Sequence, residues 1–172
     1  MDAQPLPGVS IVGDLDRCRD TPLPIETDSI DEFLLSHVLE HIRDPLPMMQ
    51  ELHRVAKPNA VAIIRVPYGS SDDAFEDPTH VRQQFLSSFG YFSQPFYWRA
   101  DYNYRGDWLV RKITLVVPRQ ENEGLTTQQI MDKVKMLRNV VREMVAELVA
   151  VKPIREPLRE LQTRHPVNIE LV

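Results

Sequence analysis

The sequence predicts a single α/β domain built on a parallel sheet. Apolar runs of strand length recur along the chain, and an amphipathic stretch with helical spacing separates two of them. Their connections are short, and no linker rich in glycine or serine divides the chain. With 172 residues and 42% hydrophobic content, the chain can bury one core. We therefore expect one domain over residues 1–172.

The first half of the chain predicts strands on either side of a helix. Residues 9–12 (VSIV) and 32–36 (EFLLS) are apolar runs of strand length. A helix is expected to begin at Pro45, where a missing N–H is tolerated in the first turn, and to stop before Pro58. Residues 60–66 (AVAIIRV) predict a strand that is covered on both faces.

The second half predicts two strands and two helices after an irregular aromatic stretch. Thr126 or Thr127 can cap the longer helix. The expected elements are a strand over 107–117, a helix over about 126–151, a short helix over about 154–162 and a strand over 167–172.

The expected helix at about 126–151 carries apolar residues at alternating spacings of four and three. Such a seam is typical of a helix that packs on another helix, although covering the sheet is the plainer alternative. The sequence thus favours a homo-oligomer or a heteromer formed through this helix. The seam residues are Ile130, Val134, Leu137, Val141, Met144, Leu148 and Val151.

Composition narrows the classes of function. The net charge of −5 and the scattered lysines and arginines argue against a nucleic-acid-binding surface. The single cysteine, Cys18, excludes an internal disulfide and a multi-cysteine metal site. No apolar window is long enough to span a membrane, and the first residues lack the features of a signal peptide. We expect a cytoplasmic protein without nucleic-acid or membrane contacts.

The stretch HVLEH, residues 37–41, matches the spacing H-x-x-E-H of one class of zinc peptidases. The chain breaks soon afterwards at Pro45, and no third ligand is evident among His53, His80 and His165. We therefore expect no metal there, and a strand that ends and turns into a short helical segment. Ligands of open parallel sheets bind at such strand ends, although a solvent-facing pair without a role stays open.

Four motifs follow one another in order along the chain. They are Leu23-Pro24-Ile25 with Asp28-Ser29-Ile30-Asp31, then Ser36–His41, Arg54–Pro58, and Val66-Pro67-Tyr68 leading to Phe75–His80 (FEDPTH). In this order they resemble the type-11 class of S-adenosylmethionine-dependent methyltransferases. The resemblance covers residues 2–117 and, loosely, the end of the chain. It implies a Rossmann-like sheet with helices on both faces and methyl transfer from S-adenosylmethionine.

The resemblance also assigns residues to the methyl donor. The donor carries the chemical driving force, so such a protein mainly holds donor and acceptor in line and excludes water. The implied positions are Asp2 at the ribose hydroxyls, Asp14 and Leu15 near the adenine amino group, and Ser36 and His37 at the methionine part.

On the acceptor side, the resemblance leaves the substrate unidentified. His80 is the best candidate base if the acceptor must lose a proton, because an imidazole titrates near neutrality. A capping or packing role is the alternative for His80. The aromatic residues over 91–104 are candidates for an acceptor pocket, although aromatic loops are more often simply packed.

The sequence departs from the family pattern in two places. None of its six glycines forms a G-x-G cluster near the N-terminus, where the family has a glycine-rich turn after its first strand. Asn59-Ala60 also replace the usual Gly-Gly after Lys-Pro. The sequence therefore predicts an N-terminally truncated domain in which the first strand and the glycine-rich loop are missing.

Two functions stay open on these grounds. One is a methyltransferase that uses S-adenosylmethionine and acts on an unidentified acceptor. The other is a non-catalytic oligomeric or scaffold subunit built on a degenerate methyltransferase fold. A partner chain that supplies the missing strand is a further possibility, and donor binding separates the two functions.

Overall fold

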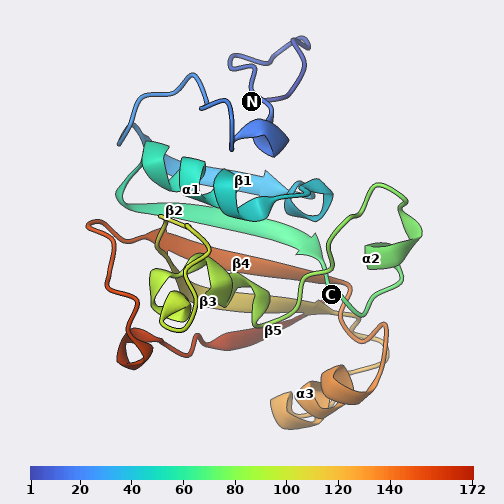
Figure 1. Cartoon of the computed structure of the whole chain (residues 1–172). Helices are drawn as coiled ribbons and strands as arrows, with labels where there is room; N and C mark the ends of the chain where they lie inside the picture. The colour runs from blue at the N-terminus through green and yellow to red at the C-terminus, as the bar shows by residue number, and fades with distance from the viewer.

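All 172 residues are described by a computed structural model. One mixed sheet organises the chain, with the strand order β1-β2-β4-β3-β5 (Figure 1). β1 is parallel to β2, β4 is antiparallel to both of its neighbours, and β5 is parallel to β3. The strands are β1 (Ile30–Ser36), β2 (Ala56–Pro67), β3 (Trp108–Val117), β4 (Glu143–Ala150) and β5 (Val167–Leu171).

Three α-helices accompany the sheet, and none is long and apolar enough to cross a membrane. α1 joins β1 to β2 and begins with Pro45 in its first turn, as the sequence predicts. In Figure 1, α1 lies in front of β1 and β2, and α3 lies beyond the ends of the strands. The helices are α1 (Pro45–Val55), α2 (Asp73–Glu76) and α3 (Thr127–Met136).

Most of the predicted strands are confirmed, but two short elements are wrong. Residues 9–12 form only an isolated bridge, between Val12 and Asp2, because no longer strand runs beside them. Of the short helix expected over 154–162, only a 3₁₀ turn at Arg159–Leu161 is present. β1 and β2 contain the predicted strands over 32–36 and 60–66, and β3 and β5 match those over 107–117 and 167–172 to within one residue.

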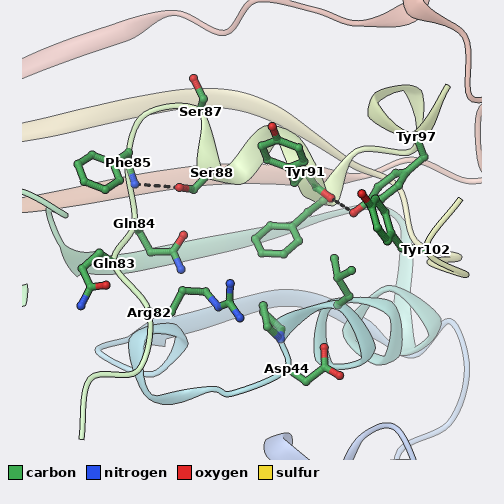
Figure 2. A pocket seen from close by; sticks show the side chains of 13 residues that line it. Asp44, Arg82, Gln83, Gln84, Phe85, Ser87, Ser88, Tyr91, Tyr97 and Tyr102 are labelled. Carbon is green, nitrogen blue, oxygen red and sulfur yellow. Dashed lines mark hydrogen bonds between the residues drawn. The ribbon is translucent and has the colours of Figure 1, made fainter. Parts of the chain in front are cut away.

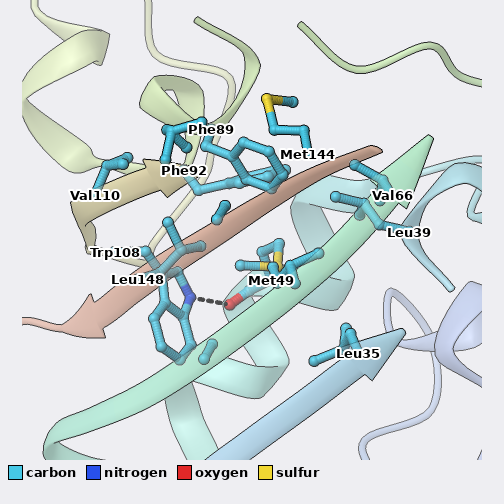
Figure 3. Packing of buried hydrophobic residues seen from close by; sticks show 14 of the residues in the cluster. Leu35, Leu39, Met49, Val66, Phe89, Phe92, Trp108, Val110, Met144 and Leu148 are labelled. Carbon is cyan, nitrogen blue, oxygen red and sulfur yellow. Dashed lines mark hydrogen bonds between the residues drawn. The ribbon is translucent and has the colours of Figure 1, made fainter. Parts of the chain in front are cut away.

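The core lies between α1, the aromatic segment after residue 85 and one face of the sheet (Figure 3). Met49 of α1 and Trp108 of β3 are fully buried, and the indole N–H of Trp108 donates to the Met49 carbonyl at 2.9 Å. Phe89 and Met144 approach the same face from the loop and from β4. Each such side chain contributes about 1.5–3 kcal/mol by leaving water.

The opposite face of the sheet is only partly covered. Leu34 of β1 is 72% exposed, and Ile63 of β2 and Val145 of β4 are half-buried. The resemblance implies helices on both faces, whereas in this chain α1 packs on one face and α3 lies beyond the ends of the strands (Figure 1). β1 is also an edge strand, with a neighbour on one side only.

The long helix expected over 126–151 is wrong beyond Met136. α3 begins with a capping box, in which the Gln129 N–H donates to the Thr126 hydroxyl oxygen at 3.3 Å and the Thr126 N–H donates to the Gln129 side chain at 2.8 Å. The helix stops at Met136, and Asn139 turns the chain with a φ of 59°. Of the remaining seam residues, Leu137 and Val141 lie in the loop before β4, Met144 and Leu148 lie in β4, and Val151 follows it.

Strand pairing explains this error. Met144 and Leu148 are four residues apart, a spacing that places side chains on one face of a strand as well as of a helix. The β-branched Val145 and Val149, each next to one of these residues, favour a strand. β4 also pairs on both edges, with β2 and with β3. An oligomer contact through a 126–151 helix therefore has no basis in this structure.

A buried ion pair joins the start of β3 to the segment after β4. Asp107 is fully buried and accepts from Nε and Nη2 of Arg155, both at 2.7 Å. It also accepts from the Gln94 N–H at 3.1 Å, so one carboxylate ties three segments together. Removing one partner of such a pair leaves an uncompensated buried charge.

We predict that Arg155→Met lowers the free energy of unfolding by about 3–5 kcal/mol, because the Asp107 carboxylate stays buried without its cation. Arg111→Met is the matched control, since Arg111 pairs with Glu147 at the surface and is half exposed. Its loss is about 1 kcal/mol or less. Urea denaturation measures both, and equal losses would contradict the prediction.

Burial also makes stability depend on pH through His53. Its Nε2–H donates to the Val151 carbonyl at 3.0 Å, and desolvation lowers the pKa of this imidazole. Because the folded pKa is below the unfolded value of about 6.5, the stabilisation is complete above that pH and is lost as pH falls below it. We predict that His53→Gln flattens the fall in the free energy of unfolding between about pH 7 and pH 5. Denaturant titrations at several pH values test this, and an unchanged slope would count against it.

Candidate functional site

The HVLEH stretch lies at the carboxyl end of β1. β1 ends at Ser36, and His37 follows with a φ of 53°, in the left-handed region. The His37 N–H donates to the Arg65 carbonyl at 2.9 Å, which extends the contact with β2 by one residue. Leu39–His41 then form a single 3₁₀ turn. The predicted change from strand to short helical turn is confirmed, and no helix presents the two histidines of HVLEH on one face.

The His37 ring is held between two carboxylates. Its Nδ1 lies 3.2 Å from Oε1 of Glu40, and its Nε2 lies 2.9 Å from Oε1 of Glu143. These two contacts, one at each ring nitrogen, set the orientation of the imidazole. Glu143, the first residue of β4, also accepts from Arg65 of β2 at 2.5 Å. The ring is thereby fixed to β2 and β4 at this end of the sheet.

The FEDPTH segment folds against HVLEH. The Thr79 hydroxyl donates to Oδ1 of Asp77 at 2.6 Å and lies 3.0 Å from Nδ1 of His41. The rings of His41 and His80 meet edge to face, with 4.8 Å between their centroids. Two motifs that are distant in the sequence therefore meet at one end of the sheet, with His80 beside His41.

A polar cavity of about 350 Å³ opens beside these residues. Four of its side chains are carboxylates, so the cavity favours positively charged groups. The side chain and N–H of Thr79 hold the pKa of Asp77 below its ordinary value. The cavity is lined by His37, Pro67, Asp73, Glu76, Asp77, His80 and Glu143.

A second, larger cavity of about 500 Å³ is aromatic (Figure 2). Tyr91, Tyr97 and Tyr102 of the predicted acceptor stretch line it, together with Arg82. The Tyr97 hydroxyl donates to the Tyr91 carbonyl at 2.6 Å, and burial raises the pKa of Tyr97 to about 12. A hydroxyl with such a pKa stays protonated and acts as a hydrogen-bond donor. The aromatic stretch thus lines a pocket as well as packing.

The residues assigned to the donor lie on separate elements. Asp14 caps the 3₁₀ turn Leu15–Arg17, where its Oδ1 accepts from the Asp16 N–H at 3.0 Å. Asp2 is exposed and accepts from the Gln4 N–H at 2.9 Å. Neither aspartate lines either of the two cavities described above. Their donor roles, like the role of His80 as a base, stay predictions.

Two residues of α1 hold the N-terminal segment in place. Glu51 accepts from the Leu23 N–H at 2.7 Å, and Arg54 donates to the carbonyls of Leu23 at 3.2 Å and Ile25 at 3.0 Å. The Arg54 guanidinium, at 2.6 Å, lowers the pKa of the Glu51 carboxyl. This clamp anchors the segment that carries Asp14 to the rest of the domain.

The sequence did not reveal several residues at this end of the sheet. Glu143 was expected on a helix, so nothing indicated that it would reach His37. Arg65 lies in a strand whose apolar pattern gave no sign of a role. Asp77 and Thr79 belong to the FEDPTH motif, and this motif was the one signal in the sequence that could have indicated a role for them.

Residues 5–64 match the family model of a methyltransferase domain. No curated protein matches the sequence significantly. The matched segment contains Asp14, Leu15, Ser36 and His37 and runs through α1 into β2. It confirms the resemblance to class I S-adenosylmethionine-dependent methyltransferases of type 11.

Solved structures confirm the fold. One is a SAM-dependent methyltransferase from Archaeoglobus fulgidus, with 12% identity, a TM-score of 0.53, and coverage of 81% of this chain and 66% of that one. Another is a putative methyltransferase from Haloferax volcanii in complex with the activator Trm112, with 15% identity, a TM-score of 0.50, and coverage of 82% and 61%. A possible histamine N-methyltransferase from Thermotoga maritima has 11% identity, a TM-score of 0.50, and coverage of 81% and 63%. This chain thus spans about two thirds or less of their lengths, and it has the Rossmann-like fold they share.

We predict that Arg54→Ala loosens the N-terminal segment, because the carbonyls of Leu23 and Ile25 lose their donor. Hydrogen exchange of residues 21–27 should accelerate by about tenfold or more, the equivalent of one or two lost hydrogen bonds. Lys57→Ala is the matched control, since Lys57 pairs with Asp31 at the surface. Unchanged exchange in Arg54→Ala would show that other contacts hold the segment.

Proposed function

Because residues 5–64 match a methyltransferase domain and the sheet has the methyltransferase fold, we propose that this chain binds S-adenosylmethionine and takes part in methyl transfer to an unidentified acceptor. One observation carries the proposal: within the matched segment β1 ends at Ser36 and His37 follows it, at the carboxyl end of the strands where ligands of such sheets bind. When bound, the donor supplies an activated methyl group.

The residues of this chain would orient the donor. Asp2, Asp14 and Leu15 would contact its nucleoside, and Ser36 and His37 its methionine part. His37 suits a positioning role, because Glu40 and Glu143 fix its ring while the side chain stays 45% exposed. A left-handed backbone at a residue with a β-carbon is unfavourable, and such strain clusters at functional positions.

The donor side is incomplete in one respect. No glycine-rich turn lies beside β1, and the outer edge of this strand is unpaired. Unpaired N–H and C=O groups on an edge strand readily accept another strand. We therefore expect donor affinity to be modest for this chain alone and to increase when β1 gains a neighbour.

The aromatic cavity supports an acceptor site. It combines three tyrosines with the cation of Arg82 and the carboxylate of Asp44. Such a lining accepts a ligand with an apolar or aromatic body and a polar group. Figure 2 shows the tyrosines and Arg82 on opposite sides of the cavity.

The partly bare sheet favours the second candidate function, a non-catalytic subunit of an assembly. Leu34 is exposed on the face without helices, and β1 has a free edge. A partner that covers this face would bury apolar area without any donor being bound. The structurally similar putative methyltransferase from Haloferax volcanii is itself described in complex with an activator protein, Trm112. Solution mass across a concentration series tests whether this chain associates.

We predict that calorimetry with S-adenosylhomocysteine, the demethylated product, detects binding of micromolar order. Asp14→Asn keeps the helix cap but removes a charge, and should weaken binding about tenfold or more. Asp20→Asn is the matched control, because Asp20 is an exposed aspartate of the same segment. Absence of heat, together with an oligomeric mass, would instead support the scaffold function.

A further inference from the structure

Three polar side chains converge where HVLEH meets FEDPTH. One oxygen of Glu40 and one ring nitrogen each of His41 and His80 all lie within 4.8 Å of one another. With metal–ligand bonds of about 2.0–2.1 Å, two ligand atoms around one tetrahedral Zn²⁺ lie roughly 3.3 Å apart, so the three side chains must rotate toward one another to coordinate an ion. The group combines residues that the sequence offered in two separate motifs.

Two atoms of this group are buried without any hydrogen-bond partner. They are Oε2 of Glu40 and Nδ1 of His80. Glu40 is only 2% exposed, and the His80 side chain is 9% exposed. A buried carboxylate oxygen and a buried ring nitrogen are costly to leave unpaired, so each needs a partner that this chain does not provide.

The neighbours of His41 leave its second nitrogen available. Nδ1 of His41 lies 3.3 Å from the Thr79 carbonyl, and a carbonyl only accepts, so Nδ1 carries the proton. In this tautomer the unshared electron pair lies on Nε2. Thr79 in turn donates to Asp77 at 2.6 Å. Histidines that bind metals are oriented in this way by a hydrogen bond at the other nitrogen.

We propose that Glu40, His41 and His80 bind a divalent transition-metal ion. Two imidazoles and one carboxylate suit Zn²⁺, Fe²⁺ or Co²⁺, whereas Mg²⁺ and Ca²⁺ prefer oxygen ligands alone. Three protein ligands leave a position open, and His80 borders the acidic cavity through which a cation can enter. Asp77, 3.8 Å from Nε2 of His80, orients this ring or supplies a fourth ligand.

This site differs from the one suggested by the H-x-x-E-H spacing. There, the two histidines of HVLEH are the ligands and the glutamate is a base. Here, His37 is engaged by Glu40 and Glu143, and His80 takes its place as the second histidine ligand. A metal-bound His80 is not free to act as a base, so the two roles proposed for His80 exclude each other.

The test uses the whole chain, stripped of metal with a chelator and titrated with Zn²⁺ by calorimetry and with Co²⁺ by visible absorption. We expect one ion per chain and a Co²⁺ spectrum typical of nitrogen and oxygen ligands. His41→Ala and His80→Ala should each weaken metal binding by about 100-fold or more. This exceeds the 10- to 100-fold loss typical when a residue that hydrogen-bonds to a metal ligand is removed. His165→Ala is the matched control and should bind as the unsubstituted chain does.

Thr79→Val gives a second measurement in case a histidine variant fails to fold. It removes the hydroxyl beside His41 and should weaken binding by about 10- to 100-fold, without removing a ligand. Absence of Zn²⁺ and Co²⁺ binding by the folded chain would overturn the proposal, and so would equal binding by the His41, His80 and His165 variants. Calorimetry with S-adenosylhomocysteine on the same metal-free sample tests donor binding separately, because the proposed ligands are not among the donor residues.

Discussion

The parallel pairing of β1 with β2 is the constraint on which the whole site depends. Its register places Ser36 beside Arg65, so the chain leaves the sheet at His37. The antiparallel pairing of β2 with β4 places Pro67 opposite Glu143, at the same end of the sheet. An imidazole, a guanidinium and a carboxylate therefore meet because backbone ladders align them, and their mutual bonds then hold the side chains.

The parts of the fold that could be predicted are those with local signals. β1, α1 and β2 have an apolar period and breaking residues of their own, which is why Pro45 and the apolar run at 60–66 were informative. β4 has no such independent signal, since the spacing of Met144 and Leu148 suits a helix and a strand equally. Its pairing with β2 and β3 makes this segment a strand, and such pairing between distant segments is not visible in the sequence pattern of one segment.

The candidate site likewise contains features that local sequence predicts and contacts that only the fold creates. That His37 would stand at the end of a strand followed from the residues next to it. The contact of His41 with His80 depends on how the loop after β2 folds back, and the contact of His37 with Glu143 depends on β4. His80 was visible in the sequence only as one of three unplaced histidines, and the fold brings it close to Glu40 and His41.

The proposed donor site and the proposed metal site rest on different parts of this architecture. Ser36 lies on an edge strand whose outer side is unpaired, so a neighbouring strand or partner chain would change the donor side directly. Glu40 and His80 are instead tied to the inner side of the sheet, through the bonds of His37 to Glu143 and the packing of the FEDPTH segment. An additional strand at β1 would thus alter the proposed donor side and leave the three side chains of the proposed metal site in place. The chain can keep an ordered polar centre even where its donor side needs completion.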